Sequence, residues 1–123
     1  MEIRSYKDLT VWKKSMELVV LIYRLADEFP KNETFGLSSQ LKRAAVSIPS
    51  NIAEGNARTT TRDFLHFLSI AYGSIKEVET QILIAERLGY DLRQQTPQLL
   101  NSTDEVARLI SGLSNSLKRK LEA

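Results

Sequence analysis

The stretch Ser47-Ile48-Pro49-Ser50-Asn51-Ile52-Ala53-Glu54-Gly55 closes a helical pattern and decides the fold class of the chain. Pro49 has no amide hydrogen and its ring crowds the carbonyl of Ala45, so we expect a kink there. Gly55 is a natural end for the helix, because glycine adopts a left-handed cap at little cost. Upstream, apolar residues recur at steps of three and four and so share one helical face: Leu37, Leu41, Ala44, Ile48 and Ile52.

A second long helix is predicted from about Arg62 to Leu88, and Gly89 is expected to end it. Thr59, Thr60 or Thr61 can cap its start, and Thr60 has Asp63 three residues on, which is the spacing of a capping box. Its apolar stripe is long and continuous: Phe64, Phe67, Leu68, Ala71, Ile75, Val78, Ile82 and Ala85.

Two further helices are predicted towards the ends of the chain. The first is capped by Asp8 and runs to about Glu28, and the last begins with Thr96 as cap and Pro97 as first position. The last helix carries one narrow apolar stripe: Val106, Ile110, Leu113, Leu117 and Leu121. Four helices with short links predict an all-α fold, an up-down-up-down antiparallel four-helix bundle that forms a single domain over residues 1–123.

Composition narrows the class of protein. The chain contains no cysteine, which excludes disulfides and thiol catalysis and is compatible with a reducing cytoplasm. No apolar run approaches the roughly 20 residues of a membrane span, and the polar N-terminus shows no secretion signal. We therefore expect a cytoplasmic protein with no membrane partner.

Several phrases, in order and at matching separations, resemble the 23S rRNA intervening-sequence protein family, also called the four-helix bundle protein family. They are the opening stretch, Tyr6-Lys7-Asp8-Leu9 with Val11-Trp12, and residues 63–68, 70–74, 77–81 and 85–90. The likeness covers roughly residues 5–92, and it implies a start of the last helix a few residues before Thr96. It implies a bacterial bundle, related to the accessory proteins of diversity-generating retroelements, which are basic pentamers that bind nucleic acid. Family members often carry several Lys and Arg after the Glu-Gly step, where this chain has only Arg58 and Arg62.

Catalytic chemistry finds little support in the sequence. His66 is the only histidine, and Asp63 precedes it with the acid-x-x-His spacing of di-metal bundles. Those sites need a second such pair, which the sequence lacks. We therefore predict a protein that is not an enzyme, with no metal, cofactor or small-molecule substrate, and we expect His66 on the exposed side of its helix.

Basic residues form a loose set that is a candidate for contacts with the phosphates of RNA or DNA. Acidic residues are interspersed with them, so an ordinary solvated surface remains the other interpretation. We therefore expect a non-catalytic protein that is associated with nucleic acid or acts as a scaffold, and the functional alternative is a protein-interaction module that does not touch nucleic acid. The set is Lys42, Arg43, Arg58, Arg62, Lys118, Arg119 and Lys120.

Self-association is predicted from an excess of apolar surface. Val20 and Leu21 interrupt the charged side of the first helix, and Leu65, Tyr72 and Leu83 broaden the stripe of the third, so these five form the predicted interface. The resemblance implies that the homo-oligomer is a pentamer.

Two carboxylates on the third helix, Glu79 and Glu86, fall on the shoulder of the apolar stripe. A partly buried carboxylate there needs hydrogen-bond donors, and Glu79 is the one assigned to a pair. Asn51 is the expected donor. The pair is interpreted as a polar lock that fixes helix register or a subunit contact, and the alternative is a site that lines a groove.

Overall fold

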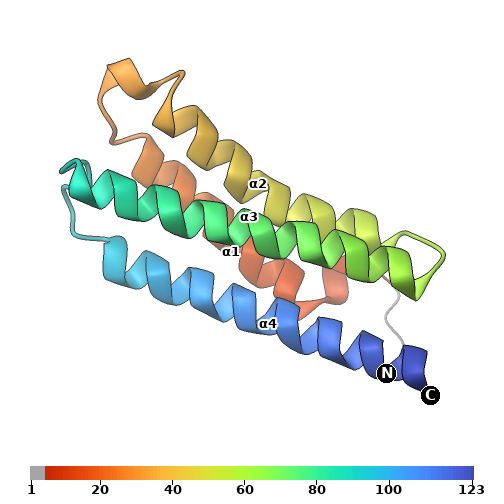
Figure 1. Ribbon diagram of the computed structural model, residues 1–123. Coiled ribbons are helices and arrows are strands. Elements are labelled where there is room, and N and C mark those ends of the chain that lie inside the picture. Colours follow the sequence, from red (N-terminus) through yellow and green to blue (C-terminus); the bar gives the residue numbers. More distant parts are fainter. Residues whose placement is uncertain (1–4) are drawn as a thin grey trace.

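The computed structural model describes residues 5–123 and confirms the all-α four-helix bundle. The helices are α1 (Thr10–Ala26), α2 (Leu37–Asn56), α3 (Thr61–Arg87) and α4 (Thr96–Glu122), and two short 3-10 turns, η1 (Tyr6–Asp8) and η2 (Lys31–Glu33), precede α1 and α2. Each helix packs against the two that neighbour it around the bundle, and consecutive helices run in opposite directions (Figure 1). Residues 1–4, which the single-domain prediction includes, lie outside the described residues.

The core is almost entirely aliphatic, and every helix contributes one face to it. The predicted stripes of α2 and α3 are buried in their central parts, whereas Phe64 and Phe67 at the start of α3 are half-buried. On α4, Leu113 is half-buried and Leu121 is exposed, so the predicted stripe is solvated near the C-terminal end. The largest fully buried side chains are Leu18, Ile22, Leu25, Leu41, Ile48, Ile52, Leu68, Ile75, Val78, Ile82, Leu99 and Ile110.

Helix α2 does not end where the sequence predicted. It continues through Pro49 and past Gly55 to Asn56, and its C-cap Ala57 has right-handed helical angles. Gly55 is buried instead against α3, where an added Cβ would lie 2.7 Å from the Cβ of Phe67. The glycine is therefore required by the close approach of two helices, and the predicted left-handed cap is wrong.

The start of α3 confirms the prediction, since the Thr60 hydroxyl accepts a hydrogen bond from the Asp63 amide at 3.1 Å. Gly89 also ends the helix as expected, with a φ of 75° that suits glycine.

The predicted caps of α1 and α4 are wrong. Helix α1 begins after Leu9, because Asp8 belongs to the preceding 3-10 turn. Thr96 lies inside α4, and the carboxylate of Asp91 caps that helix by accepting the Gln95 amide at 2.8 Å and the Thr96 amide at 2.7 Å. Both errors arise because a cap depends on the path of the preceding link.

Candidate functional site

Basic residues from two segments that are distant in sequence lie at the same end of the bundle. Arg58 lies in the α2–α3 link, Arg62 lies in the first turn of α3, and Lys118, Arg119 and Lys120 lie in the last turns of α4. Lys118 and Leu65 line the same groove between α3 and α4, so the end of α4 lies beside the start of α3. Figure 1 shows the α2–α3 link and the C-terminus at the same end of the molecule. We call these five residues the basic end.

Arg58 is held in place by two neighbours. Its Nη2 donates to Glu54 Oε1 at 3.2 Å, and its guanidinium carbon lies 4.8 Å from the centroid of the Phe67 ring. Both members of the ion pair are solvent-exposed, and such pairs contribute at most about 1 kcal/mol. A phosphate can therefore compete for Arg58 at small cost.

The structure does not bring Lys42 and Arg43 to the basic end. They lie near the start of α2, about 24 Å along the helix from Arg58 at ~1.5 Å per residue. The Nζ of Lys42 donates to Asp27 Oδ1 at 2.8 Å and lies 5.0 Å from the Tyr23 ring centroid. The predicted set of basic residues is thus divided between the two ends of the bundle.

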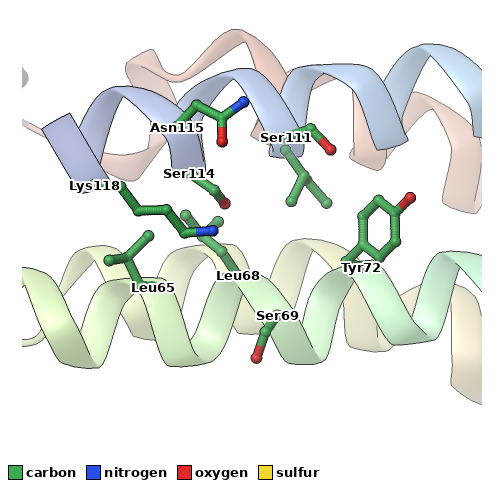
Figure 2. A pocket seen from close by; sticks show the side chains of 9 residues that line it. Leu65, Leu68, Ser69, Tyr72, Ser111, Ser114, Asn115 and Lys118 are labelled. Carbon is green, nitrogen blue, oxygen red and sulfur yellow. The ribbon is translucent and has the colours of Figure 1, made fainter.

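A groove of about 360 Å³ lies between α3 and α4 and opens next to the basic end. Figure 2 shows Leu65, Leu68 and Tyr72 rising from α3 towards α4, and Lys118 reaching from α4 towards α3. Two of the predicted interface residues, Leu65 and Tyr72, thus line a groove within one subunit. The α4 side adds polar residues that the sequence analysis missed: Ser111, Ser114 and Asn115.

The spacing of these missed residues is regular but does not by itself indicate a site. Ser111, Ser114, Asn115 and Lys118 recur at steps of three and four and so share one face of α4. In sequence this face looks like an ordinary polar surface. Only packing places it opposite the aromatic ring of Tyr72.

The other predicted interface residues lie on different faces. Val20 is 48% exposed, and on α1 it follows Met16 and precedes Tyr23 at helical spacing. Leu21 is half-buried and packs against the core of its own subunit. Leu83 is exposed on α3, three turns away from Tyr72.

The polar link between α2 and α3 differs from the predicted lock. Asn51 Nδ2 donates to the carbonyl and hydroxyl oxygens of Ser47 at 2.8 and 2.9 Å, and the hydroxyls of Ser47 and Ser74 are 2.8 Å apart. Glu79 accepts instead from Lys76 Nζ at 3.0 Å, and this hydrogen bond raises the pKa of Lys76. The expected pairing of Asn51 with Glu79 is therefore wrong, because Ser47 lies one turn from the amide and satisfies it.

His66 is exposed on α3, where its ring packs edge-on against Phe67 with centroids 5.7 Å apart. Within residues 5–123, no group of three or more His, Cys, Asp or Glu side chains is placed to hold a metal ion. None of the helices described is long and apolar enough to span a bilayer.

Comparison with known proteins places the chain in a family. Residues 7–112 match the family model described as 23S rRNA-intervening sequence protein. Among solved structures, the chain is similar to a protein of unknown function of the S23 ribosomal protein family from Bacteroides thetaiotaomicron VPI-5482, with a TM-score of 0.80 and 29% identity over 89% of this chain and 98% of that chain. No curated protein matches the sequence. The chain therefore belongs to the 23S rRNA-intervening sequence protein family.

Proposed function

We propose that this protein is a non-catalytic, homo-oligomeric bundle that associates with nucleic acid through the basic end. The observation that carries the proposal is that Arg58 and Arg62 lie at the same end of the bundle as Lys118, Arg119 and Lys120. Phosphate contacts of this kind supply most of the sequence-independent affinity for nucleic acid. The name of the matched family adds a link to ribosomal RNA.

Charge supports the choice of this end. The segments that carry its five basic residues also carry three acidic residues. The difference is two positive charges, which equals the formal net charge of +2 of the whole chain. The rest of the chain is balanced, so the positive potential is concentrated at one end of the protein. The three acidic residues are Glu54, Asp63 and Glu122.

The test is the salt dependence of RNA binding, measured by fluorescence anisotropy. Replacing Arg58 and Arg62 together by Ala should weaken binding and lower the slope of log affinity against log salt by about two at most. The matched control replaces Lys42 and Arg43 at the other end, which should leave the slope unchanged. Circular dichroism of both variants checks that they remain folded.

Two results would reject association with nucleic acid. One is the absence of binding at low salt, and the other is binding that is indifferent to the Arg58 and Arg62 changes. Either result would favour the alternative, a protein-interaction module that does not contact nucleic acid.

Self-association is proposed from the apolar face shared by α1 and α2. Met16, Val20 and Tyr23 are exposed on α1, and Val46 is exposed on α2. The antiparallel register brings Lys42 of α2 against Tyr23, so Val46, one turn further along, lies beside the middle of α1. Leu83 on α3 supplies apolar surface for a second, different contact, which a closed ring requires. The pentamer that the resemblance implies is one such ring.

Val20→Lys tests the assembly. Val20 is about half exposed in one subunit, so burying the rest stabilises each contact by about 1 kcal/mol, while a buried unpaired lysine destabilises it by more. The variant should therefore dissociate yet remain helical, whereas Leu92→Lys in the exposed α3–α4 link should not change the assembly. Light scattering measures the mass, and a value near 14.0 kDa for the unmodified protein would reject self-association.

A further inference from the structure

The groove between α3 and α4 combines features that single-stranded nucleic acid requires (Figure 2). Leu65, Leu68 and Ile110 form an apolar floor, and Tyr72 and Lys118 flank it. Tyr72 is 38% exposed, so part of its ring is available to a ligand. Sites for single strands combine aromatic faces, on which unpaired bases stack, with positive charge along the backbone, and here Tyr72 and Lys118 lie at opposite ends of one groove (Figure 2).

Charge distinguishes this groove from others on the bundle. Its described lining contains Lys118 and no Asp or Glu. Other grooves of the described chain mix both signs of charge: Glu77 and Arg43 line one between α2 and α3, and Asp27 lies with Lys31, Lys42 and Arg43 in another. An anionic ligand in this groove therefore meets one cation and no carboxylate among the described lining residues.

The polar side chains of α4 are available for a ligand. None of the hydrogen bonds described for residues 5–123 uses the hydroxyl of Ser114 or the amide of Asn115, and none of the described ion pairs uses Lys118. Lys76, whose Nζ lies 5.3 Å from the Tyr72 ring centroid, is by contrast paired with Glu79. Lys118 is thus the cation positioned to contact a phosphate.

We infer that the groove binds an unpaired segment of single-stranded RNA, with a base stacked on Tyr72 and a backbone phosphate on Lys118. Ser114 and Asn115 offer hydrogen bonds to the sugar and base edges. This inference rests on the proposed association of the basic end with nucleic acid, and it adds a preference for unpaired strands. A duplex hides the faces of its bases in the stack, so it has nothing to offer Tyr72.

The test compares fluorescein-labelled oligouridine of about ten nucleotides with an RNA duplex of the same length, using fluorescence anisotropy. Tyr72→Ala should weaken binding of the single strand by about 5- to 150-fold, the range for loss of one aromatic stacking partner, and leave duplex binding unchanged. Tyr72→Phe keeps the ring and should bind like the unmodified protein. Ile70→Ala removes a side chain of similar exposure (39%) from another face of α3 and should have no effect.

The outcomes separate this inference from the proposed function. If the protein binds single-stranded and duplex RNA equally and Tyr72→Ala changes neither, the groove is not a strand site, although the basic end still binds RNA. If Tyr72→Ala changes the mass by light scattering and not the RNA affinity, the groove is a contact for a second copy and the inference is wrong. If no RNA binds at low salt, the proposed function and the inference both fail.

Discussion

Replacing Gly55 by alanine tests a close contact between α2 and α3. The added Cβ would lie 2.7 Å from the Cβ of Phe67 and 3.0 Å from the Cδ1 of Phe64. Carbon atoms in contact are normally about 3.5–4.0 Å apart, so the helices would have to separate by about 1 Å. The Cβ of Phe67 is fixed to the backbone, so a change of rotamer cannot relieve the contact.

The magnitude follows from two opposing effects. Overpacking a buried contact costs about 1–3 kcal/mol, whereas alanine stabilises a helix interior by about 0.5–1 kcal/mol relative to glycine. We therefore expect Gly55→Ala to lower the free energy of unfolding by about 0.5–2 kcal/mol. In a chain of this size, a loss of 1 kcal/mol lowers the Tm by about 3–5 °C.

Two other helical glycines provide matched controls. A Cβ at Gly73 or Gly112 would meet none of the described atoms within 4 Å, so alanine there should raise the free energy of unfolding by about 0.5–1 kcal/mol. Urea unfolding followed by circular dichroism, at one protein concentration throughout, measures all three variants. If Gly55→Ala were as stable as Gly73→Ala, the steric explanation of this glycine would be wrong.

Three further predictions concern single side chains. Pro49→Ala should be tolerated or stabilising in thermal unfolding, because α2 runs through this position and alanine restores an amide donor to the helix; loss of folding would contradict this. Asp91→Ala should cost about 1 kcal/mol of stability at pH 7 through the lost cap of α4. Burial favours a higher pKa for Asp91, but the Thr96 hydroxyl and the Gln95 and Thr96 amides outweigh it and lower the pKa below its usual 3.8. The difference in the free energy of unfolding between the unmodified protein and Asp91→Ala should therefore be complete above about pH 4 and shrink as the pH falls further. Urea titrations down to pH 2.5 (about one unit below the ordinary pKa) measure it, and a constant difference would show that the charged carboxylate is not the cap. Ser47→Ala should destabilise the fold by about 1 kcal/mol in the same titrations, because it removes the hydroxyl link to Ser74, and an unchanged midpoint would show that the link contributes nothing.

The sequence predicted those features of the helices that depend only on neighbouring residues in the chain. The steps of three and four in the apolar residues determine which face of each helix is buried, and the cores of α2 and α3 agree with that reading. Thr60 and Gly89 were predicted correctly, because a capping hydroxyl and a left-handed glycine act on the adjacent turn of the chain. The prediction for Gly55 was wrong because glycine also occurs where two helices pack closely. The residue that requires glycine here, Phe67, belongs to another helix.

The candidate site shows the same division. Residue types in the sequence determined which side chains can contact phosphate, including Arg58, Arg62 and Lys118. Their grouping was decided by tertiary structure alone, because antiparallel packing brings the end of α4 beside the start of α3 and leaves Lys42 and Arg43 towards the other end. The groove is likewise formed by residues of two helices, so no single segment of the sequence predicts it. Tyr72 and Ser114 line the same groove only because two helices pack side by side. Helical periodicity carries no information about which faces meet.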